Sequence, residues 1–175
     1  MLAMGHCLLQ WATVETHLAL LFHTLFGPDR ETASLFWGRI RSFEAKLQIL
    51  NDLVSLRLNN TQKRLWQSLF EHTMALYRKR NQVAHSTLVS GSNGAPALEP
   101  FSTPFSENAR TLSKSDLDVF AKEFSELTSA ILYFNLNETL ASRQTECPER
   151  EPCLIDHLRK QGDRKREEQQ HRALA

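Results

Sequence analysis

The strongest constraint on the fold of this chain is an apolar repeat in residues 117–134. Its members follow one another at spacings of 3, 4, 3, 4 and 3 residues: Leu117, Phe120, Phe124, Leu127, Ile131 and Phe134. Residues three and four apart lie on one face of an α-helix, so the repeat predicts a helix with a narrow apolar seam. Such a seam suits packing in a bundle or across a dimer. Ser115-Asp116-Leu117-Asp118 approximates a capping box at the predicted start.

Three earlier regions carry the same kind of periodicity. We predict a helix from Leu2 to Phe26, a helical region from Glu31 to Leu58 with a break near residues 38–42, and a helix from Thr61 to about His85. The connecting segments contain residues that end helices or cap new ones. The predicted apolar stripes are Leu8, Trp11, Val14, Leu18, Leu21 or Phe22 and Leu25 in the first region, Phe43, Leu47, Leu50 and Val54 in the second, and Leu65, Leu69, Leu76 and Val83 in the third.

Two other segments lack any helical period. Ser86 to Lys114 is rich in Ser, Gly, Pro and Asn, and we interpret it as a mobile insertion with a short hairpin around Leu98 to Phe105. Residues 143–175 form a polar linker and a highly charged tail. The sequence therefore predicts an all-α, up-and-down bundle of about four helices over residues 1–142, with a long polar loop before its last helix.

Composition limits the class of protein. A content of 41% hydrophobic and 23% charged residues is typical of an ordinary globular protein. No apolar stretch is long enough to cross a membrane. The net charge of +1 creates no global attraction for nucleic acid, so any such contact needs a local cluster of cations. Met1 to Cys7 lacks the basic start of a signal peptide, and three sparse cysteines favour a reducing, cytoplasmic compartment.

One arginine interrupts an apolar stripe. Arg80 follows Leu76 by four residues and precedes Val83 by three, so it lies on the face that we expect to be buried. A guanidinium on such a face needs a partner or a purpose. Arg80 also opens the string Arg80-Asn81-Gln82-Val83-Ala84-His85 at the end of the predicted helix. Arg-x4–6-His spacings occur elsewhere in the chain, so the setting of Arg80 matters more than the spacing.

This constellation resembles the HEPN family of all-helical domains, which carry an Arg-x4–6-His motif near the end of a bundle helix, often with a polar residue directly after the arginine, as Asn81 is here. Two segments that precede the motif are also similar to the family. They are Trp11-x-x-Val14-Glu15 in an early amphipathic helix and Ser42-x-x-x-Lys46-Leu47 at the start of a second one. The resemblance covers residues 1 to about 140. It implies a metal-independent endoribonuclease of a toxin–antitoxin or defence system, with a homodimeric composite site and an antitoxin or nucleotidyltransferase partner.

The chemistry of these residue types fits RNA cleavage. RNA supplies its own nucleophile, the 2′-hydroxyl, so no metal or cofactor is expected. His85 can act as acid and base near neutral pH, and Arg80 can stabilise charge on the phosphate. Asn81 lies one turn before His85 and can orient its ring. Because one histidine cannot easily serve both sides of phosphorus, we expect two Arg–His pairs to meet in a dimer with two-fold symmetry.

Further residues are weaker candidates, each with a simpler interpretation. Lys46, Arg78, Lys79 and Ser86 are candidates for RNA binding, although a solvated lysine is the simpler reading of Lys46. Glu15 is a candidate partner of Arg80, and otherwise a partly solvated carboxylate. Tyr77 can support the site, with core packing as its default role.

Ligand types alone suggest two further features in the tail. Cys147, Cys153 and His157 have the right side chains for zinc, but their spacing is irregular and we predict no metal site. Arg164-Lys165-Arg166 can touch phosphates, but two glutamates follow at once and favour a solvated helix.

Alternatives to the nuclease remain open at the level of sequence. Cations near a helix C-terminus also bind free carbonyls and complement the helix dipole, which would make Arg80 and His85 structural. The chain can then be a non-catalytic HEPN-like module that binds a protein partner or a nucleotide. It can also be a regulatory bundle without any nucleic-acid role.

Overall fold

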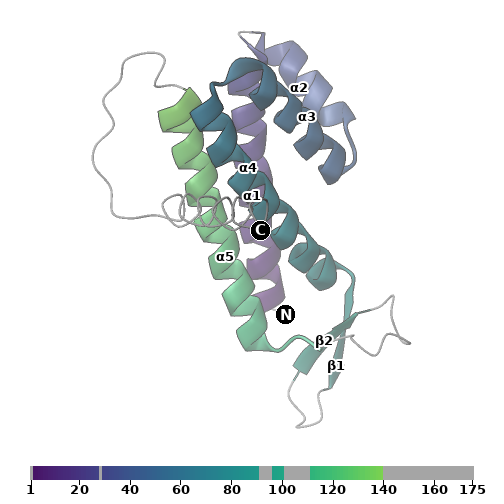
Figure 1. Cartoon of the computed structure of the whole chain (residues 1–175). Coiled ribbons are helices and arrows are strands. Elements are labelled where there is room, and N and C mark those ends of the chain that lie inside the picture. Colours follow the sequence, from purple (N-terminus) through teal and green to yellow (C-terminus); the bar gives the residue numbers. More distant parts are fainter. Residues whose placement is uncertain (1, 28, 91–95, 101–110, 140–175) are drawn as a thin grey trace, which may run out of the picture.

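The computed structural model describes residues 2–27, 29–90, 96–100 and 111–139, and these residues form a helical bundle with one small hairpin (Figure 1). Its elements are α1 (Leu2–Phe26), α2 (Arg30–Arg39), α3 (Phe43–Arg57), α4 (Asn60–Ala84), β1 (Ser86–Ser90), β2 (Pro96–Pro100), α5 (Lys114–Tyr133) and the π-helical end η1 (Phe134–Thr139). The predicted all-α class and the break between α2 and α3 are confirmed. The predicted tail, with its candidate zinc ligands, lies outside the described residues.

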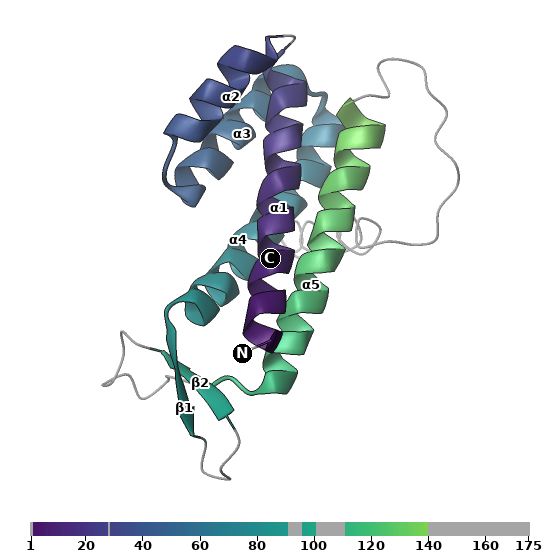
Figure 2. The same cartoon turned by 180° about the vertical axis from the view of Figure 1, so that it is seen from behind.

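Three long helices make the body of the bundle. α1 and α5 begin at the same end of the molecule, and α4 runs in the opposite direction (Figures 1 and 2). The shorter α2 and α3 pack against the other end of α1. α1 contacts each of the other four helices, so it is the central element of the fold.

Aromatic residues fill the centre of the core. Trp11 of α1 is 2% exposed, and its ring centroid lies 5.1 Å from that of Phe43, 6.0 Å from Tyr77 and 5.2 Å from Phe124. These contacts join α1 to α3, α4 and α5. Burying so large a side chain among four elements supplies much of the apolar stabilisation of the bundle.

The predicted apolar stripes are right for most residues and wrong at two. In α1 the buried residue is Cys7, whereas Leu8 is half-buried. In α5 Ala121 is buried, whereas Phe120 is half-buried and lies beside the ammonium of Lys79. Small side chains occupy the buried positions because closely packed helices leave little room there.

Side-chain hydrogen bonds cap the N-termini of α4 and α5. Asn59 and Gln62 form a capping box at α4. At α5 the N-cap is Ser113, not the predicted Ser115: the Ser113 hydroxyl accepts from the Asp116 N–H, and the Asp116 carboxylate accepts from the Ser113 N–H at 2.8 Å. The prediction was wrong by two residues because both serines lie three residues before a carboxylate, Asp116 and Asp118, so the spacing alone does not choose between them.

The two serines provide a matched test of this cap. We expect Ser113→Ala to destabilise the protein by about 1 kcal/mol, because the N–H of Asp116 loses its acceptor. Ser115→Ala removes the same hydroxyl inside the first turn and should cost almost nothing. Urea unfolding followed by circular dichroism measures both values, and equal losses would contradict the assignment.

The segment predicted as a mobile insertion contains an antiparallel hairpin. β1 pairs with β2 from Ser86–Pro100 to Ser90–Pro96, and Leu98 also forms a bridge with Leu112. The described hairpin begins at residue 86, earlier than the predicted Leu98 to Phe105, and residues 101–105 of that prediction lie outside the described residues. Leu98 and Leu112 are both buried, so the bridge seals the core near the start of α5.

Two searches of the described residues found nothing. No described helix is long and apolar enough to cross a bilayer. Nowhere in residues 2–27, 29–90, 96–100 and 111–139 do three or more His, Cys, Asp or Glu side chains gather in a way that could hold a metal ion.

Burial of Cys7 predicts a pH-dependent stability. It raises the pKa of the thiol from its usual 9.0 to about 11. The folded state therefore holds the proton more tightly, and this stabilisation is present below pH 9 and lost as the pH rises from 9 to 11. Between pH 8 and 10.5 we expect a Cys147→Ser/Cys153→Ser variant to lose about 2 kcal/mol more than the same variant carrying Cys7→Ala. Equal losses in urea unfolding would exclude this role.

Candidate functional site

Arg80 lies in the last turns of α4, on the stripe that includes Leu76 and Val83. Its Nη1 donates to the side-chain oxygen of Asn81 at 3.1 Å. Its Nε is buried and has no hydrogen-bond partner among the described residues. A buried cationic N–H without an acceptor is costly, so its retention calls for an explanation.

His85 forms the C-cap of α4. Its backbone N–H donates to the carbonyls of Asn81 and Val83, and its φ of −107° and ψ of 24° end the helix. The imidazole is exposed to solvent, one helical turn beyond Asn81. The backbone thus fixes the position of His85, while its ring remains accessible to a ligand.

The hairpin begins directly after this histidine. The Ser86 hydroxyl donates to the carbonyl of Gln82, and Ser86 pairs with Pro100 as the first residue of β1. The hydroxyl thereby satisfies one of the free carbonyls at the helix end. Ser86 therefore holds the end of α4 in place and is not free to donate to a phosphate in this arrangement.

Glu15 does not pair with Arg80. Its carboxylate accepts a hydrogen bond of 2.7 Å from the indole N–H of Trp11, and within the described residues no ion pair joins it to the arginine. The expected pairing is replaced because a buried indole N–H also needs an acceptor, and Glu15 lies one turn away on the same helix. Tyr77 has the packing role: it stacks on Phe43 with centroids 4.5 Å apart.

The candidate RNA-binding cations lie in different surroundings. Lys79 binds Glu123 of α5 through distances of 2.6 and 2.8 Å, so its charge is used between helices. Arg78 is exposed. Lys46 lies on α3 with its ammonium 5.2 Å from the ring centroid of Trp37. The structure therefore joins the side chains of Arg80 and Asn81, places His85 one turn later at the end of the helix, and engages Lys79 with Glu123.

Two exposed arginines near Lys46 were missed by sequence reasoning. Arg39 ends α2, and Arg41 lies in the turn before α3. Residues 29–85 contain ten Lys or Arg and five Asp or Glu, a net charge of +5 against +1 for the whole chain. Most of this excess lies in residues 59–85, and residues 29–58 have a net charge of only +1, so a charge count does not single out the two arginines.

The site offers a fixed cation, an amide and an accessible imidazole within two helical turns. A guanidinium binds phosphate oxygens through two parallel hydrogen bonds, and an imidazole transfers protons near neutral pH. Comparison with protein-family models, with curated proteins and with solved structures returned no match to this chain.

Proposed function

We propose that this chain is a metal-independent endoribonuclease of the HEPN type, with Arg80, Asn81 and His85 as its site. The observation that carries the proposal is the guanidinium of Arg80. Its Nη1 donates to the Asn81 amide oxygen, and among the described residues no hydrogen bond joins it to a carbonyl of the last turn, as a structural cap would require. Its buried Nε still lacks an acceptor among the described residues. A phosphate oxygen is the kind of acceptor that this group would bind.

The reaction follows from these groups. His85 takes the proton of the RNA 2′-hydroxyl, and the oxygen attacks the adjacent phosphorus. Charge builds on the non-bridging oxygens, where Arg80 stabilises it. The bond from phosphorus to the 5′-oxygen breaks and that oxygen takes up a proton, which leaves a 2′,3′-cyclic phosphate and a 5′-hydroxyl.

The protonation of the leaving oxygen motivates a homodimer. A second histidine on the far side of phosphorus would supply that proton, and a two-fold axis near His85 would bring it there. An exposed His85 at the end of a helix is compatible with such a composite site. We also propose cytoplasmic action and silencing by an antitoxin or nucleotidyltransferase partner, both of which rest on the resemblance and on the sparse cysteines.

Cleavage of a labelled RNA in EDTA tests the proposal. We expect products that end in a 2′,3′-cyclic phosphate, identified by mass spectrometry, and no cleavage of the matching 2′-deoxy strand. Light scattering on the same sample should give the mass of a dimer. Intact RNA after incubation with freshly folded dimer would reject the nuclease.

A non-catalytic binding module is the second candidate, and the outer face of α1 favours it. This helix contains a single charged residue, Glu15, and its exposed side carries apolar residues: Leu2, Leu9 and Leu20, which are 92%, 64% and 50% exposed. Exposed apolar residues along one helix are typical of a surface that binds a protein. On this reading RNA stays intact, and Leu9→Glu weakens capture of the partner.

A further inference from the structure

We infer that the corner between α2 and α3 binds the part of an RNA strand that extends beyond the cleavage site, an inference that rests on the proposed function. The α2–α3 corner is defined here as Trp37, Arg39, Arg41 and Lys46. No residue of this corner other than Lys46 entered the sequence-based candidate site. Three features support this role: packing contacts between the corner and α4, cations without an ion pair among the described residues, and an aromatic ring that is partly exposed.

Contacts connect the corner to the site. The Lys46 ammonium lies 5.2 Å from the ring centroid of Trp37, and Lys46 is three residues after Phe43 in the first turn of α3. Phe43 in turn stacks on Tyr77 of α4 at 4.5 Å. Asn81 and His85 follow Tyr77 by one and two helical turns, a rise of about 12 Å. These packing contacts place the start of α3 against α4 about two helical turns before His85, and we infer that a strand leaving His85 along α4 extends toward the corner.

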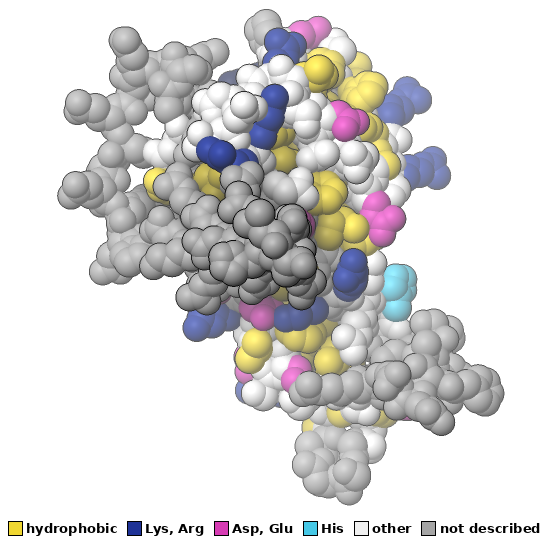
Figure 3. Space-filling model, viewed as in Figure 1, with side chains coloured by type: hydrophobic (Ala, Val, Ile, Leu, Met, Phe, Trp, Pro, Cys, Tyr) yellow, Lys and Arg dark blue, Asp and Glu magenta, His cyan; other side chains and the backbone are white. Residues whose placement is uncertain are grey.

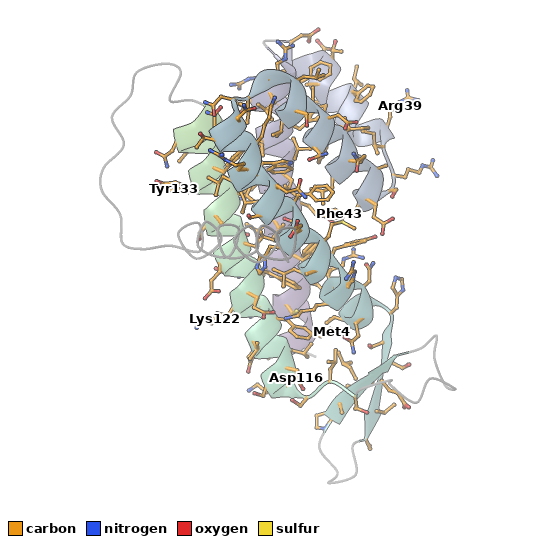
Figure 4. All side chains as sticks on the ribbon, in the orientation of Figure 1. Met4, Arg39, Phe43, Asp116, Lys122 and Tyr133 are labelled. Atoms are coloured by element: carbon orange, nitrogen blue, oxygen red, sulfur yellow. The ribbon has the colours of Figure 1, made fainter. Side chains whose placement is uncertain are left out.

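The cations of the corner have no carboxylate partner in the part of the chain that the structure describes. None of Arg39, Arg41 and Lys46 forms an ion pair within the described residues, whereas Lys79 and Lys122 do. Figure 4 shows Arg39 and Phe43 on one side of the molecule and Lys122 on the opposite side. In Figure 3, Lys and Arg side chains lie over α2 and α3 beside hydrophobic and some acidic ones. Unpaired guanidiniums fit a chain of phosphates.

Trp37 supplies the aromatic ring. Of the three tryptophans in the chain, Trp11 and Trp66 are 2% and 1% exposed, whereas Trp37 is only half-buried. A phosphate that binds Lys46 can draw the ammonium off the indole, and the uncovered face can then stack on a base. Cations beside an aromatic surface are the combination that binds single strands without sequence preference.

The binding test uses a labelled 2′-deoxy 12-mer, which cannot be cleaved, and fluorescence anisotropy across a range of salt concentrations. For Arg39→Ala/Arg41→Ala we expect at least tenfold weaker binding at low salt. The slope of log K against log[salt] should flatten by about 1.4, because each lost phosphate contact on a single strand contributes about 0.7. The matched control is Lys114→Ala/Lys122→Ala, which removes the same charge from α5 and should change affinity less than twofold.

Tryptophan emission provides an independent readout. The 12-mer should quench part of the emission of the wild type, and Trp37→Phe should abolish this quenching, since Trp11 and Trp66 are buried. Cleavage of a dinucleotide should be unaffected by Arg39→Ala/Arg41→Ala, because a dinucleotide occupies only the Arg80–His85 region. Unchanged salt slope and quenching in these variants would overturn the inference.

The outcomes separate this inference from the nuclease proposal. Binding that depends on Arg39 and Arg41, without any RNA cleavage by the wild type, would remove the nuclease and retain a nucleic-acid surface at the corner. Cleavage of a long RNA at the wild-type rate by Arg39→Ala/Arg41→Ala, with unchanged binding of the 12-mer, would retain the nuclease and remove the nucleic-acid surface at the corner. A third outcome is that polyglutamate binds, that Arg39→Ala/Arg41→Ala weakens this binding at least tenfold, and that neither the 2′-deoxy 12-mer nor RNA binds. The corner would then be a protein-docking surface, and the inference would be wrong.

Discussion

His85→Ala is expected to lower the rate of RNA cleavage in EDTA by about 10²–10⁴-fold, because the 2′-hydroxyl loses its base. Arg80→Ala should lower it by about 10²–10³-fold, through loss of charge stabilisation on the phosphate. Single-turnover cleavage of a labelled RNA measures both rates. Arg80→Lys should recover little activity, since a lysine ammonium cannot reproduce the planar pair of hydrogen bonds.

The two control variants remove the same types of side chain at positions away from the candidate site. Arg64→Ala removes an exposed guanidinium from the first turns of the same helix, and His6→Ala removes an exposed imidazole from α1. Both should cleave at the wild-type rate. Circular dichroism must show that the Arg80 and His85 variants keep the fold. If they do and cleavage is unchanged in both, Arg80 and His85 are structural cations at a helix end.

Trp11→Ala should give the largest loss of stability, about 3–5 kcal/mol, because it empties the contact point of four helices. It also leaves the half-buried Glu15 carboxylate without its indole donor. Leu9→Ala is the matched control: Leu9 lies in the same helix, is 64% exposed, and should cost less than about 0.5 kcal/mol. The free energy of unfolding in urea measures both losses. A loss below 1 kcal/mol for Trp11→Ala would show that Trp11 is not at the centre of the core.

Periodicity predicted the helices well because burial on a helix repeats every 3.6 residues. The stripes Phe43, Leu47, Leu50 and Val54 are all buried, as expected. The choice between neighbours was harder, since it depends on the space left by the opposite helix. Cys7 and Ala121 are therefore buried where the larger Leu8 and Phe120 were predicted.

The hairpin and the environment of Arg80 were less accessible to sequence reasoning. Buried and exposed residues do not alternate regularly along β1, and Leu88 is 54% exposed. The pairing of β1 also depends on a strand several residues further along the chain. The position of Arg80 on an apolar stripe was predicted correctly. Its hydrogen bond to Asn81, and the engagement of Glu15 by Trp11, depend on side-chain rotamers that spacing does not encode.

The packing of α1 along α5 has a consequence for synthesis of the protein. These two helices begin at the same end and lie side by side, yet nearly ninety residues separate the end of one from the start of the other. While the chain emerges from the ribosome, the apolar face of α1 remains without its main packing partner until α5 has been translated. Contacts so distant in sequence slow folding and leave apolar surface exposed to other chains. We therefore expect nascent chains that stop before residue 114 to aggregate or to bind chaperones.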